Sequence, residues 1–434
     1  MILSLLLFCF LLILLLRNYT KGVTQVFVLS TFLSHFVMLG HNVFTYISLI
    51  ALVLYFFNNS LLSTLQWRNT PTFIPLLIAI VSILLSNFWG YSSHTLIAFS
   101  VIASNIVLLL IMYATYKKHP QTVTSAALRT SLIYGFVIGS YALFETVTRS
   151  NPYIDMVNAL GSYTDINFIE EIRYGLKRSQ SIFSMHTTSG AVCIVLFSFL
   201  LVAKKMKYLN SRFATITIAL LFFACIATGS RSVIFGIMVC LFMFFKGKYM
   251  MPKYWIPIIM ILLFSTILFG SYIDSIVSSF INTENTGGSN VDMREQQLEI
   301  SLYYWERSFW VGNGLFYTFE HALKQTNELL GAESLWFPIM IDQGALGMLA
   351  YISFFVASIF YCIKKRCVRI CYFVLGMLAC NTLSSLPKFN VLYSIFYVVI
   401  MVDMIKRSNP KMGSINSQFI SPKHVFRIRE FPHQ

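Results

Sequence analysis

Long apolar stretches recur from one end of the chain to the other and are separated mostly by short polar segments. A helix needs about 20 mainly apolar residues to cross the ~30 Å hydrocarbon core of a bilayer, and about thirteen stretches approach that length. The pattern predicts an all-α polytopic integral membrane protein with about 12–14 transmembrane helices. The expected spans are residues 1–16, 22–39, 43–57, 72–90, 94–116, 131–147, 189–203, 213–229, 232–245, 254–273, 335–361, 370–386 and 389–405.

Two polar segments, residues 148–188 and 274–334, are too long to be simple connections between spans. Long loops in compact architectures are usually functional, so we expect any chemistry on the outer face that these loops share. The expected organisation is N-terminal transmembrane helices over 1–147, a first outer loop over 148–188, central transmembrane helices over 189–273, a large outer loop with an interfacial helix over 274–334, C-terminal transmembrane helices over 335–405 and a basic tail over 406–434.

The composition excludes a soluble protein, because 57% of the residues are hydrophobic and only 11% are charged. A net charge of +15 would suggest a nucleic-acid partner in a soluble protein, but here the basic clusters fall on one side of the expected membrane. The positive-inside rule makes that side the cytoplasm, which is also where we expect the C-terminal tail. The clusters are Arg17/Lys21, Lys117/Lys118/Arg129, Lys204/Lys205/Lys207/Arg212, Lys246/Lys248/Lys253, Lys364/Lys365/Arg366/Arg369 and the tail.

Arg231 lies between two strongly apolar stretches, in the sequence Thr-Gly-Ser-Arg-Ser at 228–232. It falls at the outer end of a span, against the positive-inside bias, and Gly229 and Ser230 interrupt the helix there. Snorkelling of the side chain to the membrane surface is one explanation. The other is that the guanidinium binds an anion, either a carboxylate from the outer loops or a lipid phosphate.

The second outer loop contains a predicted helix. Asp292 and Glu295 fit a capping box that opens a helix over about 293–309, and the glycines of 311–315 are suited to end it in a turn. One face would carry an apolar stripe suited to the membrane interface, formed by Leu298, Leu302, Trp305 and Phe309. Arg294 would lie in the first turn, beside backbone N–H groups that can bind phosphate.

Two further segments border spans on the outer side. In 173–190, the three cations Arg173, Lys177 and Arg178 approach the membrane, although a solvent-exposed charge cluster would have the same sequence. In 333–347, Glu333 precedes a span, and Asp342 lies within the apolar stretch, where a carboxylate needs a partner. Gly344 and Gly347 at small-x-x-small spacing are explained by close helix packing.

These pieces occur in the order 173–190, 228–232, 294–314 and 333–347, and together they resemble the O-antigen ligase and polymerase superfamily of bacterial membrane glycosyltransferases. The motifs cover roughly the second half of the chain. The resemblance implies a GT-C-like membrane fold that acts on sugar chains carried by undecaprenyl pyrophosphate, on the outer side of the bacterial inner membrane. It also implies that no cofactor, metal or nucleotide sugar takes part.

The sequence departs from the family pattern at two places. Ligases of the family begin the last motif with a histidine, whereas this chain has Glu333 with the remaining spacing kept, which favours a polymerase. A ligase of the same superfamily stays as the alternative. In the first motif the family usually shows a glycine and a Pro-Asn pair, where this chain has Ser181 and Met-His-Thr-Thr.

From the resemblance and the chemistry together we expect Arg231 and Arg294 to bind the departing pyrophosphate and Glu333 to act as general base. Aromatic side chains in this region would stack on sugars or anchor in the lipid interface. The residues expected to bind substrate are Arg173, Lys177, Arg178, His186, Tyr304, Trp305 and Arg307. The implied partners are the lipid-linked oligosaccharide, membrane lipids, a chain-length regulator and a flippase, with no nucleic acid.

Two other classes of protein would also place cations here. A flippase for lipid-linked oligosaccharides needs cations for the pyrophosphate, but it would carry charges within many central spans and lack large outer loops. In this chain the charges gather on one face, which favours an enzyme. A structural or sensory membrane protein leaves the outer arginines unexplained.

Overall fold

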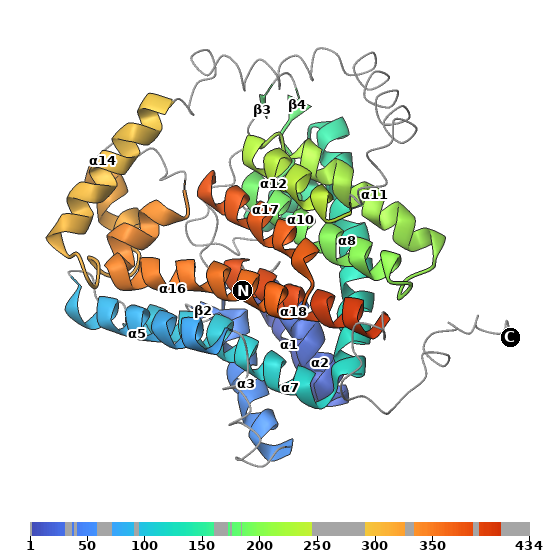
Figure 1. Ribbon diagram of the computed structural model, residues 1–434. Helices are drawn as coiled ribbons and strands as arrows, with labels where there is room; N and C mark the ends of the chain where they lie inside the picture. Colours follow the sequence, from blue (N-terminus) through green and yellow to red (C-terminus); the bar gives the residue numbers. More distant parts are fainter. Residues whose placement is uncertain are drawn as a thin grey trace, which may run out of the picture.

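The computed structural model describes residues 2–30, 37–38, 41–58, 72–90, 95–159, 172–173, 176–183, 185–244, 291–325, 334–384 and 390–408. The described part is a bundle of helices, shown in Figure 1. Its first half contains α1 (Ile2–Arg17), α2 (Tyr19–Ser30), α3 (Val43–Asn58), α5 (Phe73–Trp89), α6 (Thr95–Val101), the π-helical η2 (Ile102–Val107), α7 (Leu108–Lys118), α8 (Pro120–Thr148) and α9 (Pro152–Ala159).

The second half continues this helical pattern. It contains α10 (His186–Lys205), α11 (Arg212–Ala227), α12 (Arg231–Leu241), η3 (Phe242–Phe244), α14 (Val291–Arg307), η6 (Thr318–Ala322), α15 (Leu323–Gln325), α16 (Trp336–Lys364), η8 (Val368–Ile370), α17 (Cys371–Thr382) and α18 (Asn390–Ser408). Two antiparallel pairs of two-residue strands also occur, β1 (Val37–Met38) with β2 (His41–Asn42) and β3 (Ile172–Arg173) with β4 (Leu176–Lys177). These short strands were not predicted from the sequence.

Four described helices are long and apolar enough to cross a bilayer: Ala98–Lys118, Pro120–Thr148, His186–Lys205 and Trp336–Lys364. Shorter apolar helices accompany them at the predicted spans 1–16, 43–57, 72–90, 213–229, 232–245 and 370–386. The protein is therefore an all-α polytopic membrane protein. The predicted span at 254–273 and the segments 274–290 and 409–434 lie outside the described residues, so the number of spans and the place of the tail stay predictions.

Two predicted spans differ from the helices in extent. The helix predicted at 131–147 begins at Pro120, since proline suits the first helical turn, and only His119 separates it from the end of α7 at Lys118. The stretch predicted as one span at 22–39 is not one helix: α2 ends at Ser30, and Val37–Met38 pairs with His41–Asn42 as a short strand.

Helix α10 forms the centre of the bundle. It packs against α8, α11, α12, α17 and α18, and most of its length is buried, as expected for a helix that is apolar all round. Gly190 on α10 faces Val233 of α12 so closely that a Cβ there would lie 2.4 Å from a valine methyl. Close packing of this kind holds the start of α12 against the core.

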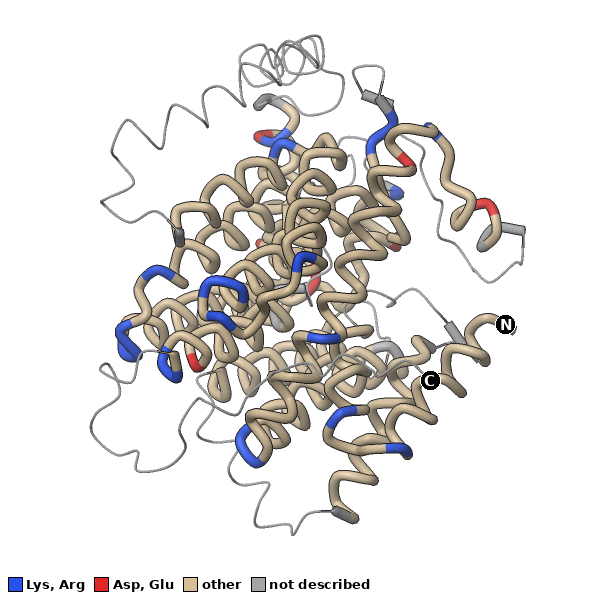
Figure 2. Tube along the Cα trace, turned by 90° about the vertical axis from the view of Figure 1, so that its right-hand side faces the viewer, with Lys and Arg blue, Asp and Glu red and all other residues tan. Residues whose placement is uncertain are grey.

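The basic ends of several helices gather at one end of the bundle. Tyr116 at the end of α7 donates a 2.8 Å hydrogen bond to Asp403 on α18, and Ser408 contacts Met206 after α10. Figure 2 shows that most Lys and Arg positions lie at helix ends and in the turns between helices. The basic ends of α7, α10 and α18 thus lie together.

Helix α16 is bent at Gly344, where φ is +61° and the chain leaves helical geometry. The bend releases backbone groups from the helical hydrogen-bond ladder, and the segment 309–313 takes them up. Asn313 N donates to Ile341 O at 2.8 Å, and Ala345 N and Leu346 N donate to the carbonyls of 309 and 310 at 2.8 and 3.1 Å. We call this contact the α16 joint.

The α16 joint brings the backbones of Gly312 and Gly344 together. A Cβ built on Gly344 would lie 2.6 Å from Gly312 N, and one on Gly312 would lie 2.3 Å from the carbonyl carbon of Asp342. Both glycines also have positive φ, which residues with a side chain rarely adopt. Glycine is thus required at 312 and at 344 because the two backbone segments approach each other closely there.

We expect Gly344→Ala to destabilise the protein by about 2 kcal/mol or more, because alanine is strained at this φ and its methyl group would separate the two backbones. The thermal midpoint of the purified, detergent-solubilised protein measures the effect. Leu349→Ala on the exposed face of the same helix is the control and should change the midpoint little. Equal midpoints for Gly344→Ala and wild type would contradict the account of the joint.

Candidate functional site

Three predicted motifs meet at the end of α17, in residues 381–384, which we call the α17 terminus. Arg294 of α14 donates from Nη2 to Leu383 O at 3.1 Å. Ser232 of α12 forms a hydrogen bond with Ser384. Helix α14, helix α12 and the segment that opens α16 are far apart in the sequence, so the α17 terminus gathers them into one region.

The segment that opens α16 docks on the same terminus. Leu335 N donates to Asn381 O at 3.0 Å, and the Trp336 indole donates to Thr382 Oγ1 at 3.0 Å. Ser334 and Leu335 are buried. Glu333 lies outside the described residues, directly before this anchored segment.

Arg231 is the first residue of α12 and is only partly exposed. The chain turns sharply before it, since Gly229 has a φ of +58° and Thr228 Oγ1 bonds back to Cys225 O at 2.7 Å. A helix N-terminus carries partial positive charge, so the arginine and the helix end favour an anion at the same place. Ser230 and Ser232, whose hydroxyls are 2.8 Å apart, flank the arginine.

Arg178 braces the turn that precedes Arg231. Its Nε donates to Thr228 O at 3.0 Å, and its stem covers Gly229, where a Cβ would lie 3.2 Å from Arg178 Cγ. The next residue, Ser179, donates its backbone N–H to Ala227 O at 3.0 Å. Arg178 is only 5% exposed, so its charge lies inside the protein beside the Arg231 turn.

Lys177 has a different setting from its neighbour. Its Nζ lies 3.4 Å from Glu145 Oε1, and both side chains are buried. An isolated buried charge is strongly unfavourable, and the opposite charge beside it offsets much of that cost. The ion pair accounts for Lys177 without a bound substrate.

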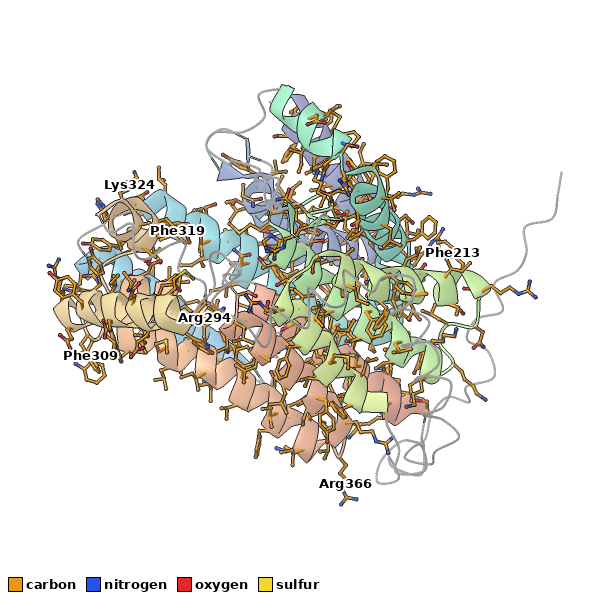
Figure 3. The ribbon with its side chains drawn as sticks, turned by 90° about the horizontal axis from the view of Figure 1, so that it is seen from above. Phe213, Arg294, Phe309, Phe319, Lys324 and Arg366 are labelled. Carbon is orange, nitrogen blue, oxygen red and sulfur yellow. The ribbon has the colours of Figure 1, made fainter. Side chains whose placement is uncertain are left out.

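The arginines of α14 lie near its two ends. Arg294 and Arg307 are about 20 Å apart along the axis for a rise of ~1.5 Å per residue. In Figure 3, Arg294 lies at the end of α14 that faces the bundle, and Phe309, just beyond the other end, points outward. Arg307 lies over the Tyr303 and Tyr304 rings, with its Cζ 4.4 and 5.5 Å from their centroids. Arg307 is therefore not grouped with Arg294 at the α17 terminus.

The aromatic residues predicted to bind sugar belong to the Arg307 end. Tyr304 is buried against Tyr317 and the α16 joint, and burial raises the pKa of its hydroxyl. Trp305 stacks on Phe309 with ring centroids 4.7 Å apart and donates to the Phe309 carbonyl. These contacts give both rings a packing role, and they lie away from the Arg231 turn.

The predicted helix over 293–309 is present as α14, shifted by two residues to Val291–Arg307. Three residues of the predicted apolar stripe are exposed, since Leu298, Leu302 and Phe309 have 43, 37 and 45% of their surface exposed. Trp305 is partly exposed, and Phe309 lies two residues beyond the end of α14. In Figure 1, α14 lies at the edge of the bundle beside the start of α16. Such a surface suits the membrane interface.

Asp342 has the partners that a carboxylate in an apolar span requires. Its Oδ1 accepts hydrogen bonds from Thr318 N at 2.8 Å and Thr318 Oγ1 at 2.6 Å, and the side chain is 1% exposed. Its backbone carbonyl accepts a 2.5 Å bond from Ser86 of α5. Asp342 thus stabilises the α16 joint and is remote from solvent.

Two other predicted residues are placed only in part. His186 is the first residue of α10 and is partly exposed. Arg173 lies on β3, paired with Leu176, and only its backbone is described. Among the residues that the structure describes, no three His, Cys, Asp or Glu side chains gather as a possible metal site.

Sequence reasoning missed the α17 terminus and Glu145. The run Asn-Thr-Leu-Ser-Ser at 381–385 places polar residues at the end of an apolar span, which is a visible signal for a buried polar contact. Glu145 is an acidic residue at the end of a predicted span, and a charged residue at such a position is likewise a signal for a buried polar contact. Which motif each would contact depends on the fold.

Comparison with known families finds one match in the centre of the chain. Residues 216–352 match the family model described as O-Antigen ligase, and this range includes Arg231, Arg294 and Glu333. Comparison with curated proteins gives no match. The family match, together with the all-α polytopic fold, supports membership of the chain in the O-antigen ligase and polymerase superfamily, whose members are enzymes of the glycosyltransferase type.

Proposed function

We propose that the protein is a polysaccharide polymerase that transfers a glycan from undecaprenyl pyrophosphate to the terminal sugar of another lipid-linked repeat unit. The observation that carries this proposal is the meeting of two arginine-bearing helix starts at one place. Arg294 contacts Leu383, and Ser232, next to Arg231, contacts the adjacent Ser384. Two cations from separate helices are suited to one doubly charged ligand.

The chemistry of the donor explains the need for these cations. As the bond between the sugar and the pyrophosphate breaks, negative charge grows on the departing lipid pyrophosphate. Guanidinium groups fixed where that charge develops stabilise the transition state more than the ground state, which lowers the barrier. Arg178 adds a third positive charge behind the Arg231 turn, and its 3.0 Å bond to Thr228 holds that turn in place.

The acceptor is a sugar hydroxyl that attacks the anomeric carbon from the side opposite the pyrophosphate. Its proton must leave as the new bond forms, and Glu333 is our candidate for the general base. Direct attack inverts the anomeric centre. Glu333 directly precedes Ser334 and Leu335 in the sequence, and Leu335 bonds to Asn381 at the α17 terminus.

The site is proposed to face the periplasm or cell exterior. Helices α7, α10 and α18 end in basic residues at the other end of the bundle, which the positive-inside rule assigns to the cytoplasm together with the C-terminus. The bacterial inner membrane is the compartment where lipid-linked repeat units are exposed on that outer face. A chain-length regulator and a flippase are the protein partners that such a reaction needs.

An O-antigen ligase is the second candidate function, favoured by the description of the matched family. A ligase would transfer the same donor glycan to a lipid acceptor rather than to another repeat unit. Both reactions use the same cations on the donor side, so the acceptor distinguishes them. Glu333 in place of the histidine of the ligases is our reason to prefer the polymerase.

Arg231→Ala and Arg294→Ala should each lower polymer formation by about 100- to 1,000-fold, the usual effect of removing one group that stabilises transition-state charge. Surface polysaccharide resolved on a gel measures chain length, and membrane abundance is measured in parallel. Arg369→Ala, an exposed arginine at the basic end, is the control and should form normal polymer. Near-normal polymer from either test variant would remove that arginine from the mechanism.

Glu333→Gln should reduce turnover by about 100-fold or more while leaving donor binding unchanged, because the amide cannot accept the proton of the attacking hydroxyl. Initial rates of purified protein in detergent or nanodiscs measure the effect. Glu299→Gln, an exposed glutamate on α14, supplies the matched control. Full activity of Glu333→Gln would exclude Glu333 as the base.

Purified protein supplied with lipid-linked repeat units should lengthen the glycan without ATP or an ion gradient. A flippase would instead move the lipid across a vesicle membrane and form no longer chain. Addition of a lipid A-core acceptor tests the ligase alternative, since only a ligase would modify it in preference to another repeat unit. Absence of any transfer product would contradict both candidate functions.

A further inference from the structure

Glu145 is a fully buried carboxylate that the proposed reaction does not use, although it contacts one of the motifs directly. It lies in the last turn of α8. Its Oε2 accepts hydrogen bonds from Ser179 Oγ at 2.9 Å, Gln180 N at 3.0 Å and Ser181 N at 2.6 Å. Its Oε1 faces Lys177 Nζ at 3.4 Å. One carboxylate therefore binds four groups of the segment 177–181.

The segment 177–181 needs such support for its conformation. Ser181 has a φ of +52°, in the left-handed region that residues with a side chain seldom adopt. Besides Glu145, Asn151 donates to Ser181 O at 2.9 Å, and Ser181 Oγ donates to Ile138 O at 3.3 Å. The segment is thus held on one side by α8 and the residue that precedes α9.

On its other side the segment holds the turn before Arg231. Arg178 Nε donates to Thr228 O and Ser179 N donates to Ala227 O, both at 3.0 Å. The Arg178 stem lies against Gly229, the residue that turns the chain. Glu145 thus contacts segment 177–181, and this segment contacts residues 227–229, which lead directly into Arg231.

We propose that Glu145 is a positioning residue for the pyrophosphate site: it fixes segment 177–181, and through Arg178 it sets the place of Arg231. The inference rests on the proposed function, because it gives Glu145 an effect on the same reaction. Glu145 contacts no substrate and moves no proton. Its carboxylate acts by accepting the three hydrogen bonds of residues 179–181, while Lys177 balances its charge.

The first test is Glu145→Gln, which keeps the size of the side chain but replaces one oxygen by an NH₂ group. That group must face either the Lys177 ammonium or the three donors of residues 179–181, so it displaces the segment in both orientations. A displacement of about 1 Å can lower turnover on the order of 100-fold. Glu299→Gln is the matched control and should keep the wild-type rate.

Adding Lys177→Met separates positioning from charge. In the double variant Glu145→Gln/Lys177→Met the amide nitrogen can face the methionine, and the oxygen again faces the three donors. We expect turnover to recover to within about threefold of wild type, since neutral partners of the same shape can replace a buried ion pair. A chemical role of the carboxylate or of the Lys177 cation would leave the double variant inactive.

A double-mutant cycle with Arg178→Ala separates positioning from general destabilisation. If Glu145 acts through Arg178, then Glu145→Gln should change turnover by less than about twofold once Arg178 is alanine. In the same background it should still lower the thermal midpoint, because the loss of the Glu145 contacts remains. If the loss of turnover in Glu145→Gln/Arg178→Ala equals the product of the two single losses, the residues act independently and the inference is overturned.

The outcomes keep this inference apart from the proposed function. Wild-type protein that lengthens glycan while Glu145→Gln is equally active overturns the positioning role alone. Wild-type protein that forms no transfer product overturns the proposed function and the positioning role with it. The positioning role is supported if Glu145→Gln loses turnover, if Glu145→Gln/Lys177→Met recovers it, and if the effect of Glu145→Gln disappears in the Arg178→Ala background.

Discussion

Every polar group held at membrane depth must bond to another part of the protein, because the hydrocarbon core offers no water to replace a missing partner. Much of the structure follows from this constraint. The bend at Gly344 is matched by the segment 309–313, which accepts and donates the hydrogen bonds that the helix loses. The buried Asp342 is matched by Thr318, and the buried Glu145 by Lys177 and the residues that follow it. At these positions the buried polar groups join separate motifs.

The α17 terminus and the α16 joint divide the motifs into two groups. The α17 terminus gathers the start of α12, the start of α14 and the segment that opens α16, whereas the α16 joint binds the far end of α14. Helix α14 is consequently fixed at both ends, while its apolar stripe stays exposed between them. A helix held in this way can lie in the membrane interface and still keep Arg294 in one place. The aromatic residues near Arg307 lie at the α16 joint and support it by packing.

Much of this arrangement could be predicted from the sequence, and the physical reason is the strength of the hydropathy signal. Apolar length located the helices, the capping residues located α14 within two positions, and the basic clusters located one end of the bundle. What could not be predicted is which polar residues meet across the bundle. Lys177, Arg173 and Arg178 looked alike as one cationic cluster, yet Lys177 is paired with a glutamate 32 positions earlier in the chain, and Arg178 is bonded to a turn 50 positions later. Such pairings depend on how the helices pack.

The α16 joint is made almost entirely by backbone groups, and this has a consequence for sequence change. Its four backbone hydrogen bonds join N–H and C=O groups of residues 309–314 and 341–346, so they do not depend on the side chains at most of those positions. Phe309, Trp310, Ala345 and Leu346 could each be exchanged for a residue of another shape without removing a bond. Only the glycines at 312 and 344 are fixed by space, since each would collide with the other strand of backbone. Related proteins can therefore preserve this architecture while sharing little more than a pair of glycines as its visible trace.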